Sequence, residues 1–211
     1  MLPVYLPCLY NDGRHLNLTT TDTELVILVA DILDLNNVMS KKRSGHNSIG
    51  YHFQFGDVSL YDFFVAAGIT PAKSLTISKV DVPDDCFPDF LRGYFDGDGS
   101  ICSFVDKRWK NSTMTYVSFC SGSDPFLAWL QVKITQLTGI RTGSFRPAND
   151  DHIGTLRYAK ADTRRLYEFM YYTPGLPALS RKYLKFVDFL NSNGYDIEVP
   201  RASGGMVYTL V

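Results

Sequence analysis

The stretch Asp89-Phe90-Leu91-Arg92-Gly93-Tyr94-Phe95-Asp96-Gly97-Asp98-Gly99 lies near the middle of this 211-residue chain and decides the fold. Pro88 suits the first turn of a helix, so a helix is expected to run through the stretch and to end near its second glycine pair. Gly93 and Gly97 are four residues apart and share one face of that helix. Because each glycine costs a helix interior about 1 kcal/mol, we expect another backbone to pack closely against this face.

Asp98 lies at the expected end of the helix, between two glycines. A short, exposed carboxylate there can bind a hard divalent cation through oxygen. An EF-hand loop starting at Asp96 is disfavoured, because its sixth and twelfth positions are Ile101 and Lys107 where glycine and glutamate are needed. A simple turn of aspartates and glycines explains the last residues of the stretch but not the helix before them.

The chain on either side repeats one order of elements: strand, helix, strand, helix. In the first half, Thr21-Asp22-Thr23-Glu24 matches a capping box in which Thr21 caps the helix and Glu24 reaches back. The elements predicted in this half are a strand at 16–19, a helix from 23 whose apolar face holds Leu25, Leu28, Val29 and Ile32, a strand at 51–55 and a helix at 58–67.

In the second half, Ser123-Asp124-Pro125 begins a helix that Gly139 ends. The other predicted elements are a strand directly after the motif, strands at 116–119 and 154–158, and helices at 162–171 and 180–190. Two such units predict a pseudo-twofold α+β protein.

Composition excludes several classes of protein. With 45% hydrophobic and 14% aromatic residues, the chain can form a core and is not disordered. No apolar run approaches the ~18 residues of a membrane-spanning helix, and the N-terminus lacks the features of a signal peptide. We therefore expect an intracellular, non-secreted protein without membrane contact. Four cysteines without a C-x-x-C pair, Cys8, Cys86, Cys102 and Cys120, are expected to be reduced and mostly buried.

Charge is distributed unevenly along the chain. The formal net charge of −1 excludes a uniformly basic DNA-coating protein, yet residues 101–165 hold ten basic and five acidic residues, a net charge of +5. The remainder therefore carries −6. A second basic cluster is Lys41-Lys42-Arg43. This pattern is typical of one surface that faces a polyanion, although solvated loops would also produce it.

The segment Leu91–Gly99 resembles the LAGLIDADG motif of the homing endonucleases, with matches at the leucine, the first glycine, both aspartates and the final glycine. The context is similar too, from Val82-Pro83 before the motif to the Ser-Asp that precedes the next helix. The resemblance covers nearly the whole chain.

The resemblance implies two αββαββα units that pack through their motif helices and form a saddle over the major groove of double-stranded DNA. It implies a site-specific endonuclease that cuts both strands with Mg²⁺, or with Mn²⁺ or Ca²⁺ in its place, and that serves intron or intein mobility. Asp98 would be the catalytic metal ligand, with Gly99 beside it, and Asp96 would be structural. Lys182 and Lys73 match the peripheral catalytic lysines, although either could be an ordinary surface charge.

The first half departs from the family pattern. Tyr5–Gly13 can be aligned with the motif, which would make Asp12 a second catalytic aspartate, but Pro3 and Pro7 oppose a helix there. Spacing also disagrees, because Asp98 precedes Asp124 by 26 residues whereas Asp12 precedes Asp22 by only 10. We expect instead a hairpin with strands at 4–10 and 14–20 around the turn Asn11-Asp12-Gly13. The first motif helix is then missing.

We therefore expect a degenerate first unit at 1–80, a second unit at 81–195 and a tail at 196–211. The missing helix could come from a second copy that pairs through Gly93 and Gly97, or from a separate polypeptide. The alternatives to an endonuclease are a catalytically inactive DNA-binding regulator and an RNA maturase. The candidate DNA contacts are polar residues of the expected strands and loops: Lys41, Lys42, Arg43, Tyr51, His52, Gln54, Ser103, Lys107, Arg108, Lys110, Ser144, Arg146, Arg157 and Tyr158.

Overall fold

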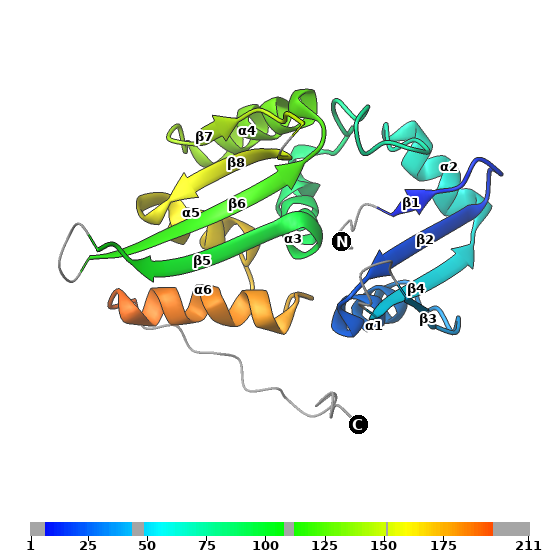
Figure 1. Cartoon of the computed structure of the whole chain (residues 1–211), viewed down its shortest axis with the longest axis horizontal. Helices are drawn as coiled ribbons and strands as arrows, with labels where there is room; N and C mark the ends of the chain where they lie inside the picture. Colours follow the sequence, from blue (N-terminus) through cyan, green and yellow to red (C-terminus); the bar gives the residue numbers. More distant parts are fainter. Residues whose placement is uncertain (1–6, 44–48, 108–111, 151, 196–211) are drawn as a thin grey trace.

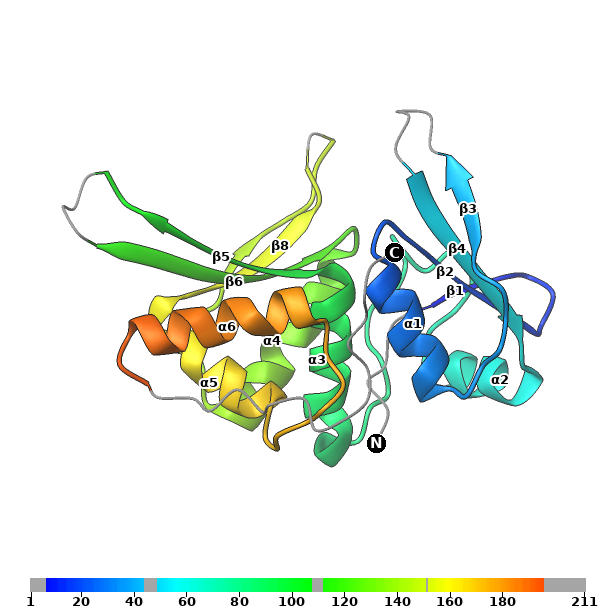
Figure 2. The ribbon, with the colours of Figure 1, turned by 90° about the horizontal axis from the view of Figure 1, so that it is seen from below.

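A computed structural model of the chain describes residues 7–43, 49–107, 112–150 and 152–195. The tail at 196–211, the start of the predicted first strand, and Arg108 and Lys110 lie outside the described residues. The described chain forms two four-stranded antiparallel sheets, with the helices gathered on one side of both (Figures 1 and 2). This confirms the predicted α+β class.

The first unit is built on β1 (Cys8–Leu9), β2 (His15–Thr20), β3 (Ser40–Arg43) and β4 (Ile49–Gly56). Their order in the sheet is β1-β2-β4-β3. Helices α1 (Thr23–Ile32) and α2 (Val58–Ala66) accompany this sheet. The predicted hairpin is confirmed by the pairing of β1 with β2 around the turn that holds Asp12.

The second unit begins with a short 3-10 helix (Asp84–Cys86) and α3 (Phe87–Asp98). Strands β5 (Gly99–Val105), β6 (Thr113–Ser121), β7 (Ser144–Arg146) and β8 (Gly154–Ala159) follow, in the order β5-β6-β8-β7. Helices α4 (Asp124–Thr138), α5 (Lys160–Met170) and α6 (Ser180–Ser192) complete the unit. The two sheets have corresponding strand orders, so the predicted duplication is confirmed. In the described residues, the first unit starts directly at β1 and has no counterpart of α3.

Helix α3 forms the centre of the core. Phe87, Phe90, Leu91 and Phe95 are fully buried and pack against the second sheet and its helices. The start of the helix is held by Arg92, whose buried guanidinium donates to Asp89 Oδ1 at 2.6 Å, to Met170 O at 2.8 Å and to Pro177 O at 2.9 Å. Since removing one partner of a buried ion pair is costly, this network fixes α3 against the segment between α5 and α6.

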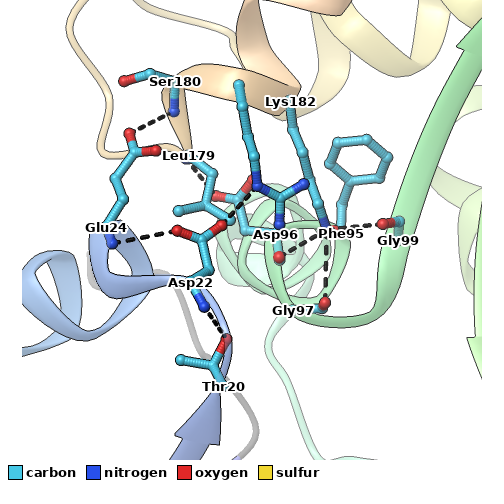
Figure 3. Close-up of polar contacts among 11 residues, drawn as sticks. Thr20, Asp22, Glu24, Phe95, Asp96, Gly97, Gly99, Leu179, Ser180 and Lys182 are labelled. Atoms are coloured by element: carbon cyan, nitrogen blue, oxygen red, sulfur yellow. Dashed lines mark hydrogen bonds and ion pairs between the residues drawn. The ribbon is translucent and has the colours of Figure 1, made fainter. Parts of the chain in front are cut away.

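The two units meet where α1 approaches the beginning of α6 (Figures 2 and 3). Leu179 is fully buried against Leu25 and Val29, which lie on the apolar face predicted for α1. Polar contacts surround this cluster: Arg181 Nε donates to Asp22 Oδ2 at 2.5 Å and Ser180 N to Glu24 Oε1 at 2.7 Å. Both acidic side chains at the start of α1 therefore bind the second unit.

These contacts correct the predicted capping box. The N-cap of α1 is Asp22, whose side chain accepts from Glu24 N at 3.2 Å, and Thr21 is exposed. Glu24 does not close the box, and its Oε1 accepts the amide of Ser180 from the other unit.

Asp22→Ala is expected to lower the free energy of unfolding by about 1 kcal/mol, because it removes the cap of α1 and the partly exposed ion pair with Arg181. Thr21→Ala removes a neighbouring side chain that caps nothing, and it should change the free energy of unfolding by less than about 0.5 kcal/mol. Urea unfolding followed by circular dichroism measures both. Equal losses in the two variants would contradict the assignment of the cap.

The cysteines only partly match expectation. All four thiols are free, but Cys8 and Cys102 are exposed and only Cys86 is fully buried. None of the described helices combines the length and the apolar character needed to cross a membrane.

Candidate nucleic-acid interface

Each sheet has one face against the helices and one open face, and both open faces look to the same side of the molecule (Figure 2). Successive residues of a strand point to opposite faces. Buried residues such as Phe53, Phe55, Val117 and Phe119 identify the helix-facing set. The strand register then assigns every other position to the open face.

On the second sheet, the open face carries Arg157 and Arg146. Arg157 lies opposite Ser118 on β6 and Ser144 on β7, and Arg146 lies opposite Thr155. The Arg157 guanidinium is 5.2 Å from the centre of the Tyr116 ring, which belongs to the same face. The register also places half-buried Tyr116 and the buried Ser118 and Thr155 on this face, none of which was predicted as a contact.

On the first sheet, the open face carries His52, Gln54 and Lys42. His52 pairs with Thr19 and Ser40, and Gln54 pairs with Asn17. Lys41 and Arg43 pair with Tyr51 and Ile49, which assigns them to the helix-facing side of the sheet. Both residues are exposed there, at the edge strand β3. Lys107 is exposed just beyond the end of β5.

Besides Lys41 and Arg43, three predicted DNA contacts do not lie on the open faces. Tyr158 is fully buried with its ring 6.3 Å from that of Phe119, so it belongs to the core. Tyr51 is half-buried and packs against the same core. The Ser103 hydroxyl lies 2.8 Å from that of Thr115 on the helix side of the sheet. In β3, β4 and β8, the predicted set included residues from both faces.

The basic stretch at 101–165 also does not form a single surface. Lys160, Arg164 and Arg165 belong to α5, in the helical layer away from the open faces (Figure 2). Arg164 pairs with Glu168 of the same helix at 2.6 Å. The predicted basic saddle is therefore confirmed only in part, through residues such as Arg146 and Arg157.

Asp98 ends α3 at a pocket between the two units. The pocket has a volume of about 370 Å³, and Asp98 is exposed in its wall. Its second-unit wall includes Gly93, Tyr94, Gly97 and Asp98 of α3 and residues 120–122, and its first-unit wall includes Cys8, residues 17–20 and Lys73. Surrounding protein partly desolvates the carboxylate and raises the pKa of Asp98, while the charges of Lys182 and Lys73 act in the opposite direction.

Lys182 is not a surface charge. It is almost fully buried, and its Nζ donates to the carbonyl oxygens of Phe95, Asp96 and Gly99, each at 2.7 Å (Figure 3). The carbonyl of Asp96 is among those that the end of an α-helix leaves without intrahelical partners, whereas the carbonyl of Phe95 also accepts the amide of Gly99. Burial lowers the pKa of Lys182 to about 8, against the opposing charge of Asp96. Lys182 thus holds the end of α3 that carries Asp98.

Lys73 is also buried and lies in the first-unit wall of the pocket. Its Nζ donates to the carbonyl oxygen of Pro7. Burial lowers the pKa of Lys73, whereas the charges of Cys8 and Asp98 act to raise it. A cation of the first unit therefore acts electrostatically on the carboxylate of the second.

The other motif residues have separate roles. Asp96 is fully buried and accepts the amide of Leu179 at 3.1 Å, as expected for a structural residue. Gly93 is buried, but Gly97 is exposed and a Cβ there would meet no atom within 4 Å. The close packing expected at both glycines is therefore wrong for Gly97 within this chain. Gly99 must be glycine, because a Cβ would lie 2.6 Å from the carbonyl oxygen of Phe95.

Donors for a metal ion are few. In the described part of the chain, no group of three or more His, Cys, Asp or Glu residues could hold a metal. Asp98 offers one exposed carboxylate, while the Gly99 carbonyl already accepts from Lys182. This donor set suits Mg²⁺ in its usual protein setting, where one or two carboxylates share the ion with water and substrate phosphates.

Comparison with solved structures gives a clear answer for the architecture. The fold is that of the LAGLIDADG homing endonucleases. The homing endonuclease I-WcaI, bound to its DNA recognition sequence, matches with a TM-score of 0.59 and 12% identity over 86% of this chain and 81% of that one. The meganuclease I-SmaMI, bound to an uncleaved DNA target in the presence of calcium ions, matches with a TM-score of 0.55 and 11% identity over 85% and 81%.

A different kind of neighbour is full-length DUF199/WhiA from Thermatoga maritima. It matches with a TM-score of 0.54 and 11% identity over 90% of this chain but only 56% of its own. No protein-family model and no curated protein matches the sequence. The similarity is therefore one of fold.

Proposed function

We propose that this chain binds double-stranded DNA across its two open sheet faces and hydrolyses a phosphodiester bond at Asp98 with a divalent cation, Mg²⁺ foremost. The observation that carries the proposal is the exposed Asp98 carboxylate at the end of α3, in a pocket between the two units of a homing endonuclease fold. The open faces support DNA binding, because Lys42, Arg146 and Arg157 place exposed positive charges on them.

In this proposal, Asp98 would hold the cation, which when bound would activate water and neutralise charge on the phosphate. Lys182 fixes the position of Asp98 through the carbonyl oxygens at the end of α3. The Lys73 ammonium lies in the opposite wall of the pocket, where its charge would favour a phosphate and the negative charge that develops during hydrolysis.

A DNA-binding protein without cleavage activity is the second candidate. It is favoured by one observation: Asp98 is the only carboxylate among the described residues that line the pocket. The two candidates share the DNA interface and differ only at Asp98. No described feature favours an RNA maturase.

Arg157→Ala is expected to weaken duplex binding about tenfold, because it removes an exposed cation from the open face. If Arg157 contacts a phosphate, the slope of log K against log salt should also fall by about one. The control is Arg165→Ala, which removes the same exposed charge from α5 in the helical layer and should leave both quantities unchanged. Fluorescence anisotropy with a duplex selected from a random pool gives both. Equal losses in the two variants would contradict the proposed interface.

A further inference from the structure

The open face of the second sheet carries an apolar cluster beside its arginines. Cys102 pairs with Tyr116 and Phe104 pairs with Met114, so the strand register assigns all four side chains to the open face. Phe104 is 49% exposed and Cys102 is also exposed, whereas Met114 and Tyr116 are half-buried. The open face of the first sheet instead carries the hydrogen-bonding side chains described above. The two sheets therefore present different chemistry to one ligand.

The Phe104 ring is held in place by its neighbours. It stacks on the Tyr116 ring, with the centroids 6.0 Å apart and an angle of 29° between the planes. The guanidinium of Arg157 also contacts Tyr116, and because β6 lies between β5 and β8, Phe104 and Arg157 approach that ring from opposite sides. Stacking of this kind is favourable. Phe104 is thus ordered before a ligand binds, which lowers the entropy lost on binding.

The ribbon of β5 and β6 suits a major groove. Figure 2 shows the outer part of β5 rising away from α6, and the major groove of B-DNA, about 12 Å wide, admits a two-stranded ribbon, whereas the minor groove is only about 6 Å wide. In the major groove the base edges display hydrogen-bonding groups and one apolar group, the C5-methyl of thymine. An exposed phenyl ring on the open face therefore has that methyl group as its apolar partner.

Stacking of an unpaired base is the competing use of this cluster. Proteins bind single strands by stacking bases on the faces of exposed aromatic rings. The two sides of the half-buried Tyr116 ring are already taken by Phe104 and Arg157. Contact between the edge of the Phe104 ring and a methyl group needs no free ring face. The cluster therefore favours a thymine methyl of a duplex over an unpaired base.

We propose that Phe104 contacts the C5-methyl of one thymine in the major groove of the target and thereby determines part of the sequence specificity. The inference rests on the proposed DNA binding and adds a base preference to it. Strand β5 starts at Gly99, directly after Asp98, and Phe104 lies five residues further on, a distance of about 17 Å. The contact therefore lies in a flank of the site and acts on binding, not on hydrolysis.

Replacement of single thymines by deoxyuridine tests the contact, because it removes the methyl group and keeps the base pair. Each thymine of a duplex selected from a random pool is replaced in turn, and binding is measured by fluorescence anisotropy in EDTA. For the wild type we expect binding to weaken about fourfold at one thymine, the factor that one buried methyl-sized group contributes. In Phe104→Ala, replacement of the same thymine should leave binding unchanged.

Val105→Ala is the matched control. Val105 follows Phe104 in the strand and is 63% exposed, but the register assigns it to the helix-facing side of the sheet. This variant should keep the fourfold loss at the same thymine. A wild type that binds the duplex without a loss at any thymine, or an equal loss in Phe104→Ala, would overturn the contact and leave DNA binding intact.

Two further outcomes separate the contact from its alternatives. If the wild type, but not Phe104→Ala, bound the single strand more tightly than the duplex, base stacking would replace the proposed methyl contact. If the wild type bound no duplex from the pool, both the proposed function and the inference would be overturned.

Discussion

Asp98→Asn is expected to lower the rate of DNA cleavage by at least about 1,000-fold and to leave duplex binding in EDTA within about threefold of wild type. The carboxylate is the exposed oxygen donor of the pocket, and losing the charge stabilisation of a bound metal ion costs several kcal/mol, each 1.36 kcal/mol being tenfold in rate. Single-turnover cleavage of the selected duplex in Mg²⁺ measures the rate, and anisotropy measures the binding.

Asp12→Asn is the matched control. Asp12 is the aspartate that an alignment of the first half with the motif would make catalytic, but it lies exposed in the β1–β2 turn. Hydrogen bonds from the His15 side chain and backbone lower the pKa of Asp12 to about 2, which is typical of a turn anchored by its own neighbours. The Asp12 variant should cleave at the wild-type rate. Loss of cleavage in Asp12→Asn, or full activity in Asp98→Asn, would contradict the assignment.

Lys182→Met is expected to lower the free energy of unfolding by about 3 kcal/mol and to slow cleavage as well. Methionine keeps most of the volume of the side chain but removes the lysine donor from the carbonyl oxygens of Asp96 and Gly99, and one of the two donors of the Phe95 carbonyl. Buried acceptors without partners cost about 1–3 kcal/mol each, and part of this is recovered because the buried ammonium is also removed. Urea unfolding measures the loss.

The control for this change lies one turn further along α6. Lys185 is exposed, so Lys185→Met should change the free energy of unfolding by less than about 0.5 kcal/mol. A positioning role for Lys182 also predicts that, in conditions where the variant stays folded, duplex binding persists while the cleavage rate falls. Wild-type cleavage by folded Lys182→Met would show that the end of α3 does not need this lysine.

Local patterns in the sequence predicted much of the fold. Ser123 caps α4 and Gly139 ends it with a φ of 75°, as the residue types indicate. The prolines of the N-terminal segment and the short interval from Asp12 to Asp22 correctly opposed a first motif helix, and β1 pairs with β2 instead. These features depend on residues close in sequence, so local rules were sufficient.

The site itself depends on residues far apart in sequence. Lys182 binds the end of α3 from more than 80 residues away, so matching its position could suggest a catalytic lysine but not a buried helix cap. The exposed Arg157 and the buried Tyr158 are neighbours in one strand, and only the register of β8 against β6 separates a candidate DNA contact from a core residue. Asp22 caps α1 and also binds Arg181, and Glu24 binds Ser180, more than 150 residues further along the chain.

Selection from a random pool tests most directly the central claim that the two open sheet faces bind double-stranded DNA. Wild-type protein is mixed with random duplexes in Ca²⁺, with single-stranded RNA of equal length as competitor, and the bound fraction is amplified over several rounds. We expect that one family of related duplexes is enriched and that its binding weakens steeply with salt. Retention of RNA in preference, or no enrichment of any duplex, would contradict DNA binding by these faces.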